Sequence, residues 1–246
     1  MTLKLATLNI LHNRLRWEER IGLIADALRA EQPDVIALQE VHLESQQAEI
    51  LAAMLDDPPY EVFVAPKWGD DVWEGIALLS RLPVLDYERH LLPVVERVAQ
   101  RITVEADGQA IHIANTHLHH APEDESIRLP QMRALLRWML GHANGPWLLA
   151  GDLNTLPHSA TLLRAKQYLN NAYVDCHEVQ PVTWPTPLAP DDGRDLTPKT
   201  IDYVLYTWFT LRVQSARRIA EVPHPDDPAL YPSDHYGLVV EMVPAS

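Results

Sequence analysis

Polar side chains follow the apolar segments of this chain at the points where predicted strands end. Five such positions stand out, and a sixth residue, Asp202, lies inside the segment TIDYVLY. Buried carboxylates are costly unless something pairs with them, so their recurrence predicts strand ends that converge on one site able to bind a metal ion or a phosphate. The five are Asn9 after ATL, Glu40 after VIALQ, His117 after AIHIANT, Asp152 with Asn154 after WLLAG, and Asp234 with His235 before YGLVVEM.

Each of these residues also has a structural explanation when it is taken alone. Asn and Asp favour turns, so Asn9 and the Asp152–Asn154 pair could simply end strands, and Glu40 or Asp234 could be solvated or cap a turn. A histidine such as His117, beside His119 and His120, is more often structural or exposed than functional. Asp202 is the most informative, because an aspartate between Ile and Tyr in a strand requires a partner.

The elements that would position these side chains alternate between strands and helices. Helical spacing of apolar residues predicts a helix from Trp17 to Leu28, closed by Pro33, and others at 44–55, from about Pro130, and near 159–168. Asp107-Gly108 is a hairpin signal. Residues 181–198 and 221–233, rich in Pro and Asp, are predicted surface loops. Predicted strands are 3–10, 35–39, 60–65, 75–80, 98–105, 110–118, 147–152, 200–206, 210–219 and 235–243.

The chain of 246 residues is 47% hydrophobic and contains no linker, repeat or low-complexity tract. That length and composition allow a substantial core. Strands with interspersed helices, hairpins and crossovers around one core predict an α/β fold, a layered α/β sandwich, in a single domain over residues 1–246.

Seven ordered segments resemble the endonuclease/exonuclease/phosphatase superfamily, which includes exonuclease III-like nucleases and deoxyribonuclease I-like enzymes. The resemblance covers nearly the whole chain and implies two mixed β-sheets packed together and flanked by helices, with metal-dependent phosphoester hydrolysis as the activity. Thr200, preceded by Lys199, stands where the family often has arginine. The segments are TLNI (7–10), LQEV (38–41), GIALLSRLPV (75–84), NTHL (115–118), GDLNTLP (151–157), TIDYVLY (200–206) and SDHYGL (233–238).

Oxygen donors dominate the candidate site, and this favours Mg²⁺, with Mn²⁺ as a substitute. The chain has no cysteine or multi-histidine cluster of the kind that binds zinc. Glu40 and Asp234 are the best direct ligands. Asn9, Asp152 and Asn154 are expected to bind through water or to hold a second ion.

His235 is the predicted base that activates or orients water, and Asp202 would fix its tautomer and stabilise its cation. The resemblance implies that Asp152 shares in proton transfer. Asn154 would orient the water or a phosphate oxygen. His117 and Asn9 would donate to the phosphate. Arg81 and Lys199 are the candidate phosphate-facing cations.

The formal net charge of -14 argues against tight, nonspecific binding of duplex nucleic acid, which requires a basic patch or stripe. We therefore expect a phosphodiester that is small or presented as a nucleic-acid end. A nuclease, a lipid phosphodiesterase and a phosphomonoesterase remain alternatives, since superfamily does not fix substrate. An inactive binding module would require loss of a core residue, and none is missing. Trp68, Trp73 and Trp184 could stack on a base or sugar, meet a lipid, or cover the core edge.

Cellular context is suggested by what the sequence lacks. Cys176 is the single cysteine, so no intrachain disulfide can form, and a cytoplasmic location is the simplest expectation. No apolar run approaches the roughly 20 residues that a membrane span needs, and no secretory signal is evident. We expect a monomer that does not dock to membranes.

Overall fold

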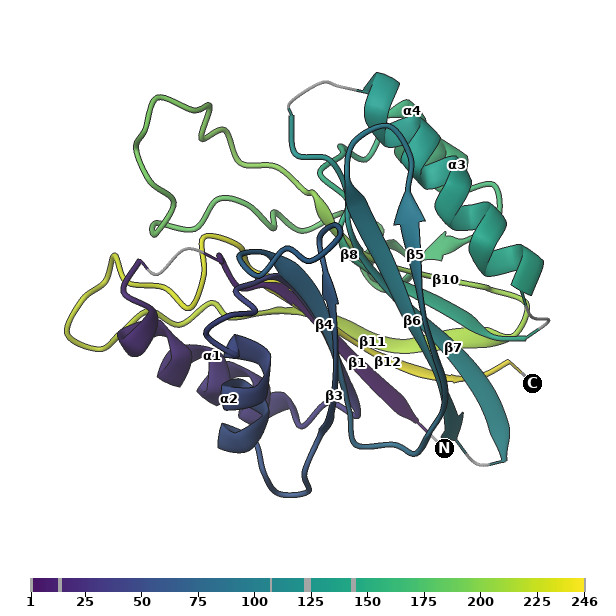
Figure 1. Ribbon diagram of the computed structural model, residues 1–246, viewed down its shortest axis with the longest axis horizontal. Coiled ribbons are helices and arrows are strands. Elements are labelled where there is room, and N and C mark those ends of the chain that lie inside the picture. Colours follow the sequence, from purple (N-terminus) through teal and green to yellow (C-terminus); the bar gives the residue numbers. More distant parts are fainter. Residues whose placement is uncertain (1, 13–14, 107, 122–124, 143–144, 246) are drawn as a thin grey trace.

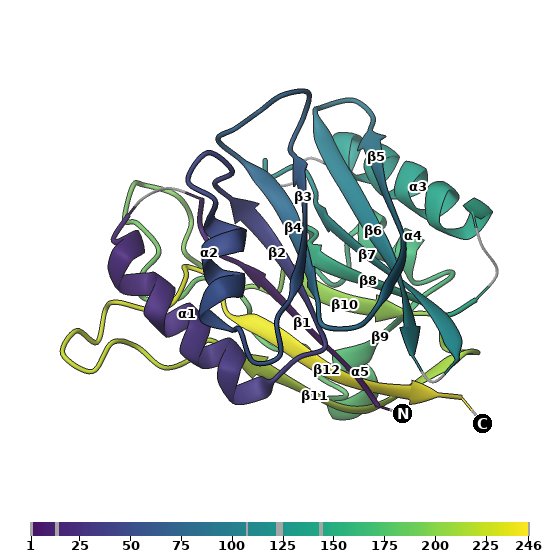
Figure 2. The same cartoon turned by 60° about the horizontal axis from the view of Figure 1, so that its bottom comes forward.

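Two six-stranded sheets lie face to face in the computed structural model, which describes residues 2–12, 15–106, 108–121, 125–142 and 145–245 (Figure 1). Helices cover the outer face of each sheet (Figure 2). This arrangement confirms the predicted layered α/β sandwich.

The first sheet has the strand order β11-β12-β1-β2-β4-β3. Its central pair, β1 and β2, is parallel, and its other neighbours are antiparallel. Helices α1 (Trp17–Glu31) and α2 (Gln47–Met54) pack on its outer face through apolar side chains. The strands are β1 (Leu3–Asn9), β2 (Val35–Val41), β3 (Glu61–Pro66), β4 (Gly75–Ser80), β11 (Leu211–Ile219) and β12 (Gly237–Pro244).

The second sheet has the order β5-β6-β7-β8-β10-β9 and repeats the same plan. Its parallel pair is β7 and β8. Helices α3 (Glu125–His142) and α4 (Ala160–Ala165) cover its outer face, and α5 (Ala172–His177) follows β9. The strands are β5 (Val84–Leu92), β6 (Arg97–Ala106), β7 (Gln109–His117), β8 (Trp147–Asp152), β9 (Asn170–Asn171) and β10 (Asp202–Tyr206).

The core between the sheets explains why the central strands read as continuous apolar runs. Leu5 and Ala37 of the first sheet and Ile113 and Leu148 of the second belong to one buried cluster. Strands buried on both faces cannot alternate apolar and polar residues, so VIALQ and WLLAG are apolar almost throughout. Their polar residues are therefore confined to the strand ends.

Most predicted elements are present, with shifts at their boundaries. Helix α3 begins at Glu125, five residues before the predicted start, so Pro130 lies inside the helix. Strands β6 and β7 form the predicted hairpin, with Ala106 paired to Gln109 and Gly108 at φ 77°; Asp107 lies outside the described residues. The sequence did not indicate β5, β9 or α5. Across the described ranges, no helix has the length and apolar character needed to cross a membrane.

Candidate active site

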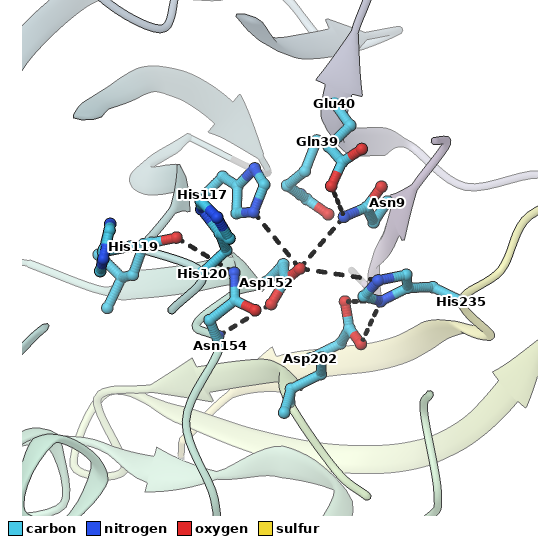
Figure 3. A network of polar contacts seen from close by, with 12 residues as sticks. Asn9, Gln39, Glu40, His117, His119, His120, Asp152, Asn154, Asp202 and His235 are labelled. Atoms are coloured by element: carbon cyan, nitrogen blue, oxygen red, sulfur yellow. Dashed lines mark hydrogen bonds and ion pairs between the residues drawn. The ribbon is translucent and has the colours of Figure 1, made fainter. Parts of the chain in front are cut away.

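The carboxyl ends of both parallel strand pairs meet at one edge of the sandwich (Figure 3). Asn9 and His117 are the last residues of β1 and β7, and Asp152 is the last residue of β8. Glu40 lies one residue before the end of β2. Parallel strands share a direction, so their terminal side chains gather at the same edge.

Two antiparallel strands begin at the same edge and supply the remaining groups. β10 starts at Asp202, which is paired directly with Asp152 of β8. β12 starts at Gly237, and its next residue, Leu238, pairs with Thr7 of β1, so the preceding Asp234 and His235 reach the same edge. The structure thus brings together the candidate residues predicted from both ends of the chain.

Asn9 joins two carboxylates that come from different sheets. Its side-chain nitrogen Nδ2 donates to Glu40 Oε1 and to Asp152 Oδ2, both at 3.1 Å. Its oxygen Oδ1 accepts from the backbone of Leu11 at 3.0 Å. Because Asn9 is fully buried and its amide hydrogens are engaged, its first role is to position Glu40 and Asp152.

A break in strand pairing aims Glu40 into the site. The β2–β4 register shifts between Leu38 and Val41, and Glu40 has φ 54° inside this irregularity. Bulges of this kind redirect a side chain next to functional sites. His12 Nδ1 lies 2.7 Å from Glu40 Oε2. Burial alone would raise the pKa of Glu40, but the contact with His12 and the charge of His117 hold it well below its usual range.

Gly151 is required where β8 delivers Asp152. It has φ 143°, and a Cβ there would lie far inside contact distance of the Thr116 carbonyl oxygen on β7. The backbone N–H of Asn154 donates to Asp152 Oδ1 at 2.8 Å, and Asn154 Nδ2 donates to the Leu118 carbonyl at 3.1 Å. The turn that these residue types favour is therefore present, and it orients the Asp152 carboxylate rather than replacing its role in the site.

His235 and Asp202 form a buried pair. His235 Nδ1 lies 3.0 Å from Asp202 Oδ2, and His235 Nε2 lies 3.8 Å from Asp152 Oδ2. Burial by itself would lower the pKa of His235, but the charge and hydrogen bond of Asp202 raise it well above its ordinary value. Nδ1 is thus committed to Asp202, and Nε2 faces the other carboxylate.

The Asp152 and Asp234 carboxylates resist ionisation. Burial, and then the facing Asp202 carboxylate, raise the pKa of Asp152 to about 6. Burial and the charge of Glu40 raise the pKa of Asp234, while the side chains of His235, Trp184 and Ser233 oppose the rise. Burial and neighbouring like charges therefore favour the neutral form of these carboxyls, and a cation bound beside them would favour the ionised form.

His117 is held between two carboxylates. Its Nε2 lies 3.5 Å from Asp152 Oδ2, and its Nδ1 lies 3.4 Å from Glu74 Oε1. Glu74 also contacts Arg97 at 3.0 Å and Lys67 at 2.5 Å. Despite burial, His117, Lys67 and Arg97 keep the pKa of Glu74 well below its usual range.

The donor set fits a hard divalent cation. One ligand atom each from Asp152, Asp202 and His235 lies within 4.8 Å of the others. Glu40 Oε1 and Asp152 Oδ2 are held by the same Asn9 nitrogen. Oxygen donors prevail, as Mg²⁺ and Mn²⁺ prefer. Asp202 is already paired with His235, so within this group Asp152 is the carboxylate that faces the other acidic side chain, Glu40, across Asn9.

Arg81 and Lys199, the two cations predicted to face the phosphate, occupy different positions relative to the strand ends that form the site. Arg81 follows β4, which runs antiparallel to β2, so it lies at the opposite edge of the sheet. There it donates to the Pro58 carbonyl at 3.1 Å and stacks over Tyr60, so the structure does not bring it together with the other candidate residues. Lys199 lies on the site's side of β10, with its Nζ over the Trp184 ring at 4.7 Å.

Sequence reasoning missed three residues near the site. Glu74 and His12 lie in loops rather than at strand ends, so no pattern marks them. Arg194, in the loop of residues 181–198, is paired with Asp192 through its Nε at 2.8 Å. The pKa of Arg194 is raised first by Asp192 and also by the charges of Asp234 and Glu40, which places this cation within electrostatic range of the site.

Of the three tryptophans that the sequence singles out, one is buried and two are exposed. Trp184 is buried and contacts Asp234, so it belongs to the structural frame of the site. Trp68 and Trp73 are exposed in the loop between β3 and β4.

Comparison with known proteins gives one family. The model described as "Endonuclease/Exonuclease/phosphatase family" matches residues 6–235. Nocturnin of Drosophila melanogaster is 27% identical, over 92% of this chain and 42% of that protein. Human Nocturnin is 26% identical, over 92% of this chain and 58% of that protein. The chain spans about half the length of these curated relatives.

Solved structures share the fold. The human Nocturnin catalytic domain with bound sulfate anion has a TM-score of 0.76 and 25% identity, covering 99% of this chain and 95% of that one. An endonuclease/exonuclease/phosphatase from Bacteroides vulgatus has a TM-score of 0.83 and 20% identity, covering both chains fully at 100%. D. rerio TDP2 complexed with single strand DNA product has a TM-score of 0.83 and 17% identity, over 98% of this chain and 99% of that one.

Proposed function

This chain belongs to the endonuclease/exonuclease/phosphatase family and is a phosphoric ester hydrolase, and on that premise we propose a Mg²⁺-dependent phosphodiesterase that acts by in-line attack of water. The observation that carries the proposal is the single edge at which Glu40, Asp152 and the His235–Asp202 pair converge. It combines a place for a hard cation with a base whose tautomer is fixed.

The His235–Asp202 pair supplies the base. A bound cation would offset the carboxylate charges that favour protonated His235, and in the neutral imidazole Asp202 would hold the proton on Nδ1 and leave Nε2 able to accept a proton from water. The Asp202 charge would then stabilise the imidazolium that results. The Asp152 carboxylate, 3.8 Å from Nε2, lies where it can share that proton or orient the water. A general base contributes typically ~10²–10⁴-fold, so it cannot carry the reaction alone.

A metal ion accounts for most of the remaining acceleration. Phosphate-ester hydrolysis requires a lowering of the barrier by up to roughly 20 kcal/mol. Glu40 and Asp234 would bind Mg²⁺ directly, and Asn9, Asp152 and Asn154 would hold its waters or a second ion; Mn²⁺ would substitute. The ion, when bound, supplies electrostatic stabilisation of the charge that develops on the phosphate.

Phosphate contacts come from the donors at the rim of this edge. We assign this role to His117, whose Nε2 faces Asp152, and to Asn154, whose Nδ2 uses one of its two hydrogens on the Leu118 carbonyl; each would donate to a phosphate oxygen. Asn9 contributes mainly by positioning, because its amide hydrogens are engaged. Lys199 is the remaining cation of the predicted set that lies on the same side.

Net charge favours a small diester or a single-stranded nucleic-acid end as substrate. With a formal net charge of -14, long-range attraction to a polyanion is unfavourable. A nuclease and a phosphomonoesterase are the alternatives. An inactive binding module is not favoured, because every residue of the predicted core set is present. We further propose one catalytic domain over residues 1–246, acting as a cytoplasmic monomer in keeping with the free Cys176.

The test is turnover on matched phosphate esters in Mg²⁺. We expect hydrolysis of bis(4-nitrophenyl) phosphate and methyl 4-nitrophenyl phosphate to exceed that of 4-nitrophenyl phosphate. Short single strands and plasmid duplex at physiological salt complete the set. Efficient plasmid nicking with little cleavage of small diesters would show that the enzyme is a duplex nuclease, and preference for the monoester would make it a phosphatase.

A further inference from the structure

The loop that joins β3 to β4 exposes large apolar side chains next to the active site. We call residues 67–74 the tryptophan loop. Within it, Trp73 is 63% exposed, Trp68 is 47% exposed and Val72 is 46% exposed. Scattered apolar residues on a surface are normal, but a cluster of them beside a catalytic edge marks a place where something binds. In Figure 2 this loop projects from the upper ends of β3 and β4.

One end of the tryptophan loop is fixed to the segment that carries His117. The Lys67 N–H donates to the Glu74 carbonyl at 2.9 Å, and Lys67 Nζ contacts the Glu74 carboxylate at 2.5 Å, so the base of the loop is closed. The other oxygen of that carboxylate lies 3.4 Å from His117 Nδ1. Glu74 therefore ties the loop to a candidate phosphate contact.

The second half of the loop also contacts the segment that carries Glu40. The Trp73 ring meets His42 edge-on, with centroids 5.2 Å apart, and His42 follows Glu40 by two residues. The Glu44 N–H donates to the Val72 carbonyl at 2.9 Å. Trp73 is thus held between the Glu40 segment and the His117 segment while most of its ring stays open to solvent.

We propose that Trp73, supported by Trp68, is a specificity-determining residue that stacks on a planar, uncharged ring beside the reacting phosphate, such as an unpaired nucleobase. This inference rests on the proposed phosphodiesterase function. The loop also carries Asp70 and Asp71, whose charges repel an anionic surface or the backbone of a duplex. A base presents an aromatic face without charge, which indole stacking recognises whatever the base.

Binding calorimetry with two matched phosphates isolates the contribution of the ligand's planar ring to affinity. Adenosine 5′-monophosphate and ribose 5-phosphate share sugar and phosphate and differ by the base. In the presence of Mg²⁺ we expect the wild-type protein to bind the nucleotide about 5- to 150-fold more tightly, the range of one base–aromatic stack. Trp73→Ala should make the two affinities nearly equal by weakening the binding of the nucleotide alone. Trp73→Phe should restore most of the difference in affinity.

The matched control is Trp208, which is 60% exposed beyond Tyr206, at the far end of β10 from Asp202. Trp208→Ala should leave the affinity ratio unchanged. Equal binding of both phosphates by the wild type, or a Trp73→Ala variant that keeps the ratio, would overturn the inference. So would loss of sedimentation with phosphatidylcholine vesicles in Trp73→Ala alone, which would assign the loop to a membrane. Hydrolysis of methyl 4-nitrophenyl phosphate by the wild type tests the proposed function separately.

Discussion

Asp152 and Asp202 face each other directly across the antiparallel pair of β8 and β10. Both are buried, and like charges placed opposite each other in a sheet destabilise it. The pKa of Asp152 is raised to about 6 by burial and by this neighbour. The site is therefore built at a cost in stability that a bound cation would offset.

Asp152→Asn should stabilise the protein in excess chelator at pH 7. The folded-state pKa of about 6 exceeds the ordinary 3.8, so the folded state binds this proton more tightly. Protonated Asp152 carries no stability penalty below about pH 4, and the folded state loses stability relative to the unfolded state as pH rises from about 4 through about 6. We expect a gain of on the order of 2–3 kcal/mol at pH 7 that vanishes near pH 4, measured by urea unfolding. A variant less stable at both pH values would contradict this, and Asp70→Asn is the exposed control.

Mg²⁺ should raise the melting temperature of the wild-type protein, because it binds the folded state selectively. The same ion should restore activity that chelation has abolished, and Mn²⁺ should do so as well. Calorimetric scans and diester turnover provide the two readouts. A melting temperature unmoved by Mg²⁺, or full activity in excess chelator, would be incompatible with the metal mechanism.

His235→Ala should lower kcat by ~10²–10⁴-fold with the fold retained, the usual range for lost acid–base catalysis. Asp202→Asn should also lower kcat, since the amide can donate to Nδ1 and leave the wrong tautomer on His235. Circular dichroism checks the fold of both variants. If Asp202→Asn keeps the wild-type rate while His235→Ala is inactive, the pairing has no role in catalysis.

Gly151→Ala should destabilise the protein severely, by more than about 4 kcal/mol or to the point of misfolding, because its φ of 143° and the nearby Thr116 carbonyl exclude a side chain. Gly141 is the matched control. It lies in α3, where a methyl group on its Cα would meet nothing within 4 Å, so Gly141→Ala should stabilise by about 0.5–1 kcal/mol. Equal effects in urea unfolding would show that close approach of β7 and β8 does not constrain Gly151.

Arg81→Gln should lower stability and leave kcat/KM for small diesters unchanged. Its guanidinium stacks on Tyr60 at 4.4 Å and donates to carbonyls of the segment before β3. Loss of this cation–π contact and of these hydrogen bonds costs about 1 kcal/mol or more. Comparison of melting temperature with kinetics separates the two effects, and a raised KM at unchanged stability would return Arg81 to the substrate.

The fold and most of the candidate site were predictable because burial restricts which residue types a central strand can contain. Central strands covered on both faces must be apolar, so a carboxylate such as Asp152 or Asp202 is conspicuous in the sequence. Glu74 carried no such signal, since it follows an irregular loop and reaches His117 only through the packing of β4 near β7. Arg81 lies apart from the other candidate residues because β4 runs antiparallel to β2, so the end of β4 that Arg81 follows is at the opposite edge of the sheet.

Strand β12, the last strand in chain order among the described residues, lies inside its sheet between β11 and β1. The residues just before it, Asp234 and His235, complete a site whose first member, Asn9, is made long before them. A ribosome-bound chain therefore lacks the strand that joins β11 to β1 until residues 237–244 are released. Because Asp234 and His235 directly precede β12, the set of candidate site residues is complete only once this last part of the chain has been made.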